Sequence, residues 1–554
     1  MFRKKLNVIA VLLAITILSL LCLPSAVKAQ ENQKSDQIVR ALFVTPTGTF
    51  NPIMADSDYD ISVNNLVFST LLVLDLQHEL HPGLAESYEV SEDGKILTFH
   101  LRKDVKWHDG VAFTAKDVAF TLNSLAQPDY IGPLGGNVKD IVGYQEVNEG
   151  KAKELSGIKL LDDYTIECQY NEVFAPGLTR IGTEVGIIAE HIWGEISPAD
   201  WKNSTEVMGH PVGTGPFIFK EFVPGQYVEL TANDEYFDGA PASAKFIFRI
   251  TNQDTAIAAI SNGEVDLADV SNFKPGDIED LKANGVVIKT FPGVSYQYMG
   301  FNMREDIMKH KELRQAILYA INRQTVIDTI LGGNGTLINA PMLPNTWQYP
   351  KSGINEYSYD IEKSKELLSG LGYEDKNGDG VLEDADGKDL VLNLKFPTGN
   401  KVREQYAAII KQSLEKVGIK VDLESMEFSA LLDKVMSNHE FQMYLMGSSL
   451  SLDPDPIPYW SSSAASDEKG VAAWNIPGWR NEKADELMEK GLTVMDQDKR
   501  AEIYLEFSQI FNDDPPIALL YAPNIIMACS PHLQNYDAAA FVECYKANTW
   551  YVER

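Results

Sequence analysis

Residue patterns that could support catalysis are scarce in this chain. The sequence contains no Gly-x-Ser-x-Gly nucleophile elbow, no Gly-Lys-Ser/Thr phosphate loop and no His-Glu-x-x-His zinc helix. The segment His78-Glu79-Leu80-His81 resembles a metal-binding pair, but Pro82 prevents a continuing helix and no third ligand stands out. Gly213-Thr214-Gly215-Pro216 is too short for a dinucleotide fingerprint, and its proline lacks a backbone donor for phosphate. These patterns argue against an enzyme.

One loop has the spacing of a calcium-binding loop, with oxygen donors at positions 1, 3, 5, 9 and 12, a glycine at 6 and a backbone carbonyl at 7. The candidate ligands are Asp375, Asn377, Asp379, Val381, Glu383 and Asp386. Asp386 replaces the bidentate glutamate usual at the last position, and its shorter reach predicts weak binding by a structural calcium ion. The alternative is an Asp/Asn/Gly turn that needs no metal.

A second loop has the composition of a recognition element. It runs from Asp453 to Trp460 with the sequence Asp-Pro-Asp-Pro-Ile-Pro-Tyr-Trp, and the serines 461–463 follow. Its prolines predict that no helix forms there, and its acids, hydroxyls and indole make it polar and aromatic. Such stiff loops suit ligand recognition, because rigid aromatic groups lose little entropy on binding. The alternative is a proline-stiffened surface crossing.

Length and charge limit the broad class. The chain has 554 residues, 44% of them hydrophobic and 23% charged, so it is globular. A single core stops growing near about 250–300 residues, which predicts two or three lobes. The formal net charge of −31 repels phosphate groups, so we expect neither nucleic acid nor an anionic membrane as a partner.

Residues 1–29 have the features of a signal peptide. Three basic residues at positions 3–5 precede the uncharged stretch Leu6–Val27, and small or short residues at 27–29 fit a cleavage site. We therefore expect export to the periplasm or the cell surface. The stretch is long enough to remain as an uncleaved membrane anchor, which is the alternative. Leu21 precedes Cys22 where a lipobox needs a small residue, which disfavours a lipid anchor.

Three cysteines remain after residue 29, namely Cys168, Cys529 and Cys544. Export removes reducing conditions, and Cys529 and Cys544 flank a short polar loop, so they are the candidates for a disulfide. Three buried thiols are the alternative.

Helical and strand patterns alternate along the chain and predict α/β lobes. Thr114 and Asp117 have the spacing of a capping box at the start of a helix. Strands are predicted at 95–101, 246–250, 265–270 and 517–521, and helices at 113–122, 255–261, 360–371, 402–417, 482–492 and 500–511.

A set of short motifs resembles the family 5 extracellular solute-binding proteins, the peptide- and nickel-binding group that serves ABC importers. In order, the motifs are Val105–Gly110, Phe113–Val118, Gly213–Phe217, Tyr236–Gly239, Gly263–Asp266, Gly300–Asn302, Leu313–Arg323 and Gly478–Asn481. Each is weak alone, but their order and spacing across the mature chain are specific.

The resemblance implies a periplasmic-binding-protein-like fold of type II, with two lobes, a hinge, an inter-lobe cleft and an accessory domain. Lobe I would combine residues 36–75, 205–290 and 525–554, the accessory domain would span 76–204, and lobe III would span 291–524. The chain would cross between the lobes near Phe291–Tyr298 and Pro515–Tyr521. The Trp107–Gly110 motif would be structural, at the root of the accessory domain.

The resemblance also implies a ligand site. Relatives hold the ammonium group of an extended peptide with an aspartate, which corresponds to Leu452 here, or to Asp453 after a shift of one residue. Ser448 stands at a position that is often aromatic and would widen the pocket. The implied ligand contacts are Gly447, Ser448, Asp453, Trp460, Trp474, Asn475, Trp479 and Tyr298. For the tryptophans, packing within a lobe is the alternative.

The resulting hypothesis is an exported, non-catalytic and monomeric receptor that captures oligopeptides and passes them to the membrane subunits of an ABC permease. It would require no cofactor, and calcium in the loop 375–386 would have a structural role only. Alternative ligands within the same fold are an oligosaccharide, an opine or chelated nickel. An exported hydrolase is the alternative from another class, but no motif supports it.

Overall fold

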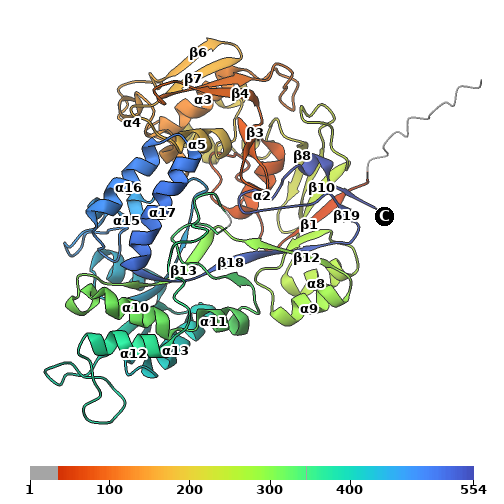
Figure 1. Cartoon of the computed structure of the whole chain (residues 1–554). Helices are drawn as coiled ribbons and strands as arrows, with labels where there is room; N and C mark the ends of the chain where they lie inside the picture. Colours follow the sequence, from red (N-terminus) through yellow and green to blue (C-terminus); the bar gives the residue numbers. More distant parts are fainter. Residues whose placement is uncertain (1–34, 345, 554) are drawn as a thin grey trace, which may run out of the picture.

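The computed structural model describes residues 35–344 and 346–553. The predicted signal peptide at 1–29 lies outside these residues, as does Cys22. Within the described ranges, no helix is both long and apolar enough to cross a membrane. Figure 1 shows a small sheet with β4, β6 and β7 at the top, a lobe with α8 and α9 at the right, and a lobe with α10–α13 and α15–α17 at the left.

A mixed sheet of twelve strands runs through both large lobes. The strands of lobe III are β16 (Lys420–Met426), β15 (Val391–Pro397), β17 (Met443–Ser449), β13 (Ser295–Phe301), β14 (Gly335–Thr336) and β18 (Ile517–Cys529). Those of lobe I are β11 (Leu267–Asp269), β12 (Val287–Pro292), β1 (Ile38–Leu42), β10 (Lys245–Ile250), β9 (Tyr227–Ala232) and β8 (Phe217–Val223). The predicted α/β class is confirmed.

Strand β18 belongs to both lobes. Its first residues pair antiparallel with β13, and its later residues pair with β11 and β12. The chain leaves lobe I after β12 and returns within β18, where Pro292 pairs with Asn524. A Cβ on Gly293 would lie 2.8 Å from the carbonyl oxygen of Pro523. Glycine therefore lets the two crossing segments lie against each other.

The first crossing lies within the predicted segment 291–298. The second lies beyond the predicted segment 515–521, because β18 still pairs with β13 up to Tyr521. The backbone passes between the lobes only after that pairing ends.

Helices cover both faces of the lobe III strands (Figure 1). On one face, α10 (Lys311–Ala320), α11 (Arg323–Ile330), α12 (Ile361–Gly370) and α13 (Lys401–Glu415) enclose one apolar core. On the other face, α14 (Phe428–Leu432), α15 (Ile457–Trp460), α16 (Glu482–Thr493) and α17 (Gln497–Asp513) enclose another. Five of these helices begin after an Asp or Asn side chain that accepts a backbone N–H, which is the usual cap. The capping residues are Asn322, Asp360, Asn400, Asn481 and Asp496.

The accessory domain is a four-stranded antiparallel sheet with short helices. Its main elements are β4 (Ala85–Val90), β5 (Ile96–Leu101), β7 (Thr165–Gln169), β6 (Ile158–Asp162), α3 (Ala115–Ala126), α4 (Tyr144–Asn148) and α5 (Gly177–Thr183). The predicted capping box is confirmed, since the Thr114 side chain accepts a backbone N–H of the first helical turn and the Asp117 side chain accepts the backbone N–H of Thr114.

The remaining α-helices and strands of the described residues, in any lobe, are α2 (Asp58–Val67), β2 (Leu72–Leu74), β3 (Leu80–Pro82), α6 (Glu190–Trp193), α7 (Thr205–Met208), α8 (Gln253–Ser261), α9 (Pro275–Ala283), β19 (Leu533–Gln534) and β20 (Tyr551–Val552).

Two of the sequence motifs meet at the root of the accessory domain. The His108 imidazole donates from Nε2 to the Gly215 carbonyl at 3.0 Å, and its Nδ1 accepts from the Gly213 N–H at 3.2 Å. The ring therefore ties the Trp107–Gly110 motif to the glycine turn of lobe I, in the structural role that the resemblance implied.

The apolar cores divide the chain into two packed bodies. One continuous core joins lobe I to the accessory domain, from Ile38 on β1 to Leu122 on α3 and Phe217 on β8. A smaller core lies under α8 and α9 in lobe I. The two cores of lobe III are separate from both. Lobe I and the accessory domain are thus bound together more tightly than either is to lobe III.

Candidate ligand-binding pocket

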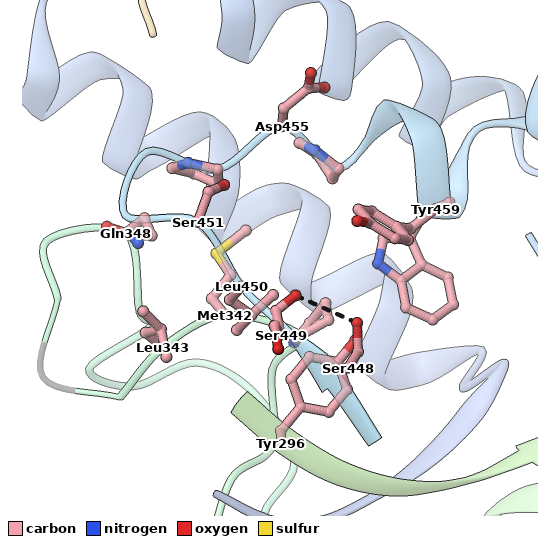
Figure 2. Close-up of a pocket in the computed structure, with 14 residues that line it drawn as sticks. Tyr296, Met342, Leu343, Gln348, Ser448, Ser449, Leu450, Ser451, Asp455 and Tyr459 are labelled. Atoms are coloured by element: carbon pink, nitrogen blue, oxygen red, sulfur yellow. Dashed lines mark hydrogen bonds between the residues drawn. The ribbon is translucent and has the colours of Figure 1, made fainter. Parts of the chain in front are cut away.

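An open pocket of about 590 Å³ lies in lobe III, close to the chain crossings. It is bounded by the start of β13, the end of β17, the segment that follows β17 and residues 341–343 and 348 (Figure 2). The lining residues are Tyr296, Pro341, Met342, Leu343, Gln348, Ser448, Ser449, Leu450, Ser451, Pro454, Asp455, Pro456, Tyr459 and Trp460.

Two neighbouring strands place Tyr296 and Ser448 side by side. β13 and β17 pair antiparallel with Tyr296 opposite Ser448, and Figure 2 shows both side chains together at one end of the pocket. Burial raises the pKa of Tyr296, so its phenol stays neutral. Hydroxyl groups both donate and accept hydrogen bonds. This end of the pocket is therefore suited to polar groups without net charge.

The wall opposite is a single helical turn, α15. The sequence predicted no helix in this proline-rich segment, and that prediction is wrong for Ile457–Trp460. Pro458 falls in the first turn, where the missing backbone N–H breaks no helical hydrogen bond. The turn brings Tyr459 and Trp460 to the pocket, and Trp460 packs edge-on against Phe511 with ring centroids 4.8 Å apart.

Two buried acceptors at the pocket lack a donor. Within the described residues, neither Oδ1 of Asp455 nor Oε1 of Gln348 has a hydrogen-bond partner. The other oxygen of Asp455 accepts from Nη2 of Arg180 at 3.0 Å, and Nε2 of Gln348 donates to the carbonyl of Leu452 at 3.2 Å. Buried polar atoms are nearly always hydrogen-bonded, so these two favour a ligand that supplies N–H or ammonium donors.

The structure gives Asp453 a different role from the predicted ammonium contact. Both of its carboxylate oxygens bind the guanidinium of Arg500, with 2.9 Å between Oδ2 and Nη1, and both side chains are buried. The carboxylate is already neutralised by a cation of its own lobe. The acidic residue that lines the pocket is Asp455, two positions later.

Two further predicted contacts lie inside lobe III and line no part of the pocket. Trp479 is fully buried and donates from Nε1 to Asp514 at 2.9 Å. Asn475 is also fully buried and donates to the carbonyls of Ser461 and Trp479, at 2.9 and 2.8 Å. These side chains hold the segment between α15 and α16 in place. For Trp479 this is the packing alternative that the sequence left open.

The remaining predicted contacts differ in position. Ser448 and Trp460 line the pocket. Trp474 is 64% exposed and contacts Tyr459 edge-on, so it lies beside a lining residue. Gly447 and Tyr298 do not line the pocket. A Cβ on Gly447 would meet the side chain of Gln297, while Tyr298 is buried against Tyr444.

Twelve of the fourteen lining residues were not among the predicted contacts. They include Tyr296, Gln348 and Asp455, whose polar groups are described above. Asp455 belongs to the acidic, proline-rich loop that the sequence singled out, and Tyr296 lies in the predicted crossing segment. Gln348 carries no signal of its own in the sequence.

Carboxylates of the predicted calcium loop accept backbone N–H groups of the loop itself. Within the described residues, no group of three or more His, Cys, Asp or Glu side chains is placed to hold a metal ion. Asp375 instead accepts the backbone N–H groups of Gly378 and Gly380, and Glu383 accepts that of Lys376. The carboxylates stabilise the turns of the loop, as in the Asp/Asn/Gly alternative.

The predicted disulfide is not formed in the structure, which contains Cys168, Cys529 and Cys544 as free thiols. Cys529 ends β18 and is held in register opposite Leu267 and Val287. Burial raises the pKa of Cys529 and of Cys544 to about 12, so both remain protonated.

Two lobes joined by paired crossings, an accessory domain packed on one of them and an open pocket beside the crossings define a two-lobed solute-binding protein. The family model of the bacterial extracellular solute-binding proteins, family 5 (middle), matches residues 79–470. The chain belongs to this family, as its motifs indicated.

Similar proteins cover nearly the whole chain. The oligopeptide-binding protein AppA of Bacillus subtilis (strain 168) is 30% identical over 531 residues, which is 95% of this chain and 93% of that protein. The dipeptide-binding protein of Escherichia coli (strain K12) is 27% identical over 472 residues, with 83% and 84% covered. These relatives are binding proteins rather than enzymes.

Solved structures confirm the predicted type II fold. The oligopeptide-binding protein AppA from Bacillus subtilis in complex with a nonapeptide superposes with a TM-score of 0.69 at 29% identity, covering 94% of this chain and all (100%) of that one. The ABC transporter substrate-binding protein CtaP from Listeria monocytogenes superposes with a TM-score of 0.78 at 25% identity and the same coverage.

Proposed function

We propose that this protein is the substrate-binding component of an ABC importer, which captures oligopeptides outside the cytoplasmic membrane and delivers them to a permease. The observation that carries the proposal is the pocket beside the crossings, whose lining combines hydroxyl groups with two unpartnered acceptors. Family membership and the names of the relatives support a peptide rather than another solute.

A peptide supplies the groups that this pocket lacks. Backbone N–H groups and a terminal ammonium are donors for Oδ1 of Asp455 and Oε1 of Gln348. The serine hydroxyls of the lining can accept from or donate to peptide groups, directly or through water, which tolerates varied side chains. Asp455 therefore takes the place of Asp453 as the acidic ligand contact in this proposal.

Capture in such a protein requires that the ligand favour the closed arrangement of the lobes, because a ligand shifts an equilibrium only through its different affinity for the two states. The crossings at 292–295 and 521–524 are the segments about which lobe III would turn. The protein would act as an exported monomer in the periplasm or at the cell surface, with the membrane subunits of the permease as its partners.

Mass spectrometry of small molecules released by denaturing the purified protein tests the proposal. We expect peptides of varied sequence and unmodified backbone. The ligand-free protein, refolded after denaturation, should then gain thermal stability with a panel of these peptides. An oligosaccharide, an opine or chelated nickel as the released and stabilising molecule would overturn the peptide assignment. Cleavage of a bound peptide would overturn the non-catalytic role.

A further inference from the structure

One ion pair connects the two packed bodies next to the pocket. Arg180 lies on α5 of the accessory domain, and Asp455 lies in the loop of lobe III that lines the pocket. Their side chains are 14% and 10% exposed, and Nη2 lies 3.0 Å from Oδ2. Since these bodies have separate cores, the ion pair exists only when the accessory domain and lobe III are together.

A backbone contact accompanies the ion pair. The N–H of Ala175 donates to the carbonyl of Leu492, near the end of α16, at 2.7 Å. Figure 1 shows α5 beside the upper ends of α16 and α17. The accessory domain therefore contacts lobe III beside the pocket.

The charges around Arg180 make this contact depend on Asp455. The guanidinium lies over the ring of Phe174, 4.9 Å from its centroid. From the same domain, Asp140 and Glu184 face Arg180, and burial raises the pKa of both carboxyl groups. Asp455 is the carboxylate with an oxygen within hydrogen-bonding distance of the Arg180 guanidinium.

We infer that Arg180 is a positioning residue for ligand capture: it binds one oxygen of Asp455 across the interface, fixes the carboxylate whose other oxygen has no partner, and so couples docking of the accessory domain to occupation of the pocket. This inference rests on the proposed function, because it assumes that the pocket of lobe III holds the ligand. Loss of the pair should leave the pocket intact and release the ligand faster.

The test compares Arg180→Met and Arg180→Lys in the full mature chain, with a peptide identified from the purified wild-type protein. We expect Arg180→Met to raise the dissociation rate about tenfold while the association rate changes little, because loss of one partner of a buried pair acts mainly on dissociation. Arg180→Lys should raise the dissociation rate less than Arg180→Met does, since lysine keeps the charge but not the planar set of donors of the guanidinium. Small-angle scattering should show that the liganded Arg180→Met protein is less compact than the liganded wild type.

Arg40→Met is the matched control, because Arg40 is also buried and pairs with Glu543 inside lobe I. It should lower thermal stability without changing the dissociation rate. Equal dissociation rates and equal compactness for wild type and Arg180→Met would overturn the inference while the proposed function stands. Failure of the wild-type protein to bind any peptide would overturn the proposed function itself.

Discussion

The guanidinium of Arg500 holds both carboxylate oxygens of Asp453, at the point where the polypeptide leaves β17 and enters the proline-rich loop. Arg500 also donates from Nε to the carbonyl of Gly491 at 2.8 Å. The pair therefore anchors the loop to α16 and α17 and leaves Asp455 at the pocket. An aspartate that the resemblance assigned to ligand binding instead supports the loop that lines the candidate pocket.

Replacement of Asp453 should destabilise the protein more than it weakens binding. Asp453→Ala leaves the buried Arg500 without its partner, which costs about 3–5 kcal/mol in the free energy of unfolding. Denaturant unfolding followed by tryptophan fluorescence measures this loss. The double variant Asp453→Leu/Arg500→Met should lose less, because it leaves no buried charge unpaired. A stable Asp453→Ala protein that no longer binds peptide would restore Asp453 as the ammonium contact.

Filling the pocket at Ser448 should abolish most binding without unfolding the protein. Ser448→Trp places an indole where the structure has an open pocket of about 590 Å³ between Tyr296 and the wall at α15. We expect the dissociation constant of a bound peptide to rise more than tenfold, which corresponds to about 1.4 kcal/mol, by calorimetry. Ser448→Ala is the control, since it removes a hydroxyl but adds no volume. Equal weakening by both variants would contradict the steric explanation.

Stability should fall in acid because of His108. Burial lowers the pKa of this imidazole to about 4, from its ordinary value of 6.5. Between about pH 6.5 and pH 4, His108 is therefore protonated in the unfolded chain but neutral in the folded chain. The free energy of unfolding is unaffected by His108 above about pH 6.5 and falls by about 3 kcal/mol as the pH drops to about 4. Unfolding curves of wild type and His108→Gln across this range isolate the effect, and parallel pH profiles would contradict it.

Gly213 should tolerate no side chain. A Cβ there would lie 1.9 Å from the carbonyl oxygen of Val67 on α2, and neither backbone segment can yield easily. We expect Gly213→Ala to cost about 3 kcal/mol, at the upper end of what overpacking costs, seen as a lowered melting temperature. Gly136→Ala provides the contrast, because a Cβ at Gly136 meets nothing within 4 Å. Similar melting temperatures for the two variants would contradict the close approach.

Cys168, Cys529 and Cys544 should all react as thiols once the protein unfolds. Burial raises the pKa of Cys168, Cys529 and Cys544 to about 12, so the native protein should alkylate slowly. In denaturant without reductant, iodoacetamide should add three labels by mass. One label that increases to three after reduction would instead show a disulfide.

Local patterns allowed most of the fold to be predicted. The capping box at Thr114, the helices of lobe III and the α/β class depend on residues close in sequence or on a recurrent periodicity. The motif resemblance supplied the lobes, because it identified a known arrangement that periodicity alone does not specify. The second crossing was placed too early because the length of pairing between β18 and β13 depends on contacts distant in sequence.

The site could be predicted only in part, for a physical reason. Ser448 and Trp460 were found through motifs, but the pairing of Tyr296 with Ser448 depends on strand register between distant segments. The partner of Asp453 lies on α17, and no spacing rule connects Arg500 to that carboxylate. This partner decides which of the two nearby acids, Asp453 or Asp455, lines the pocket, and the sequence does not reveal the partner.

The pairing of Pro292 with Asn524 has a consequence for how such proteins diversify. Lobe III, which carries the pocket, begins and ends at these paired residues, so its two ends lie side by side. A continuous segment whose ends lie side by side can be replaced by another without changing the fold of the rest of the molecule. A new specificity can thus be grafted while lobe I and the accessory domain keep their own shared core.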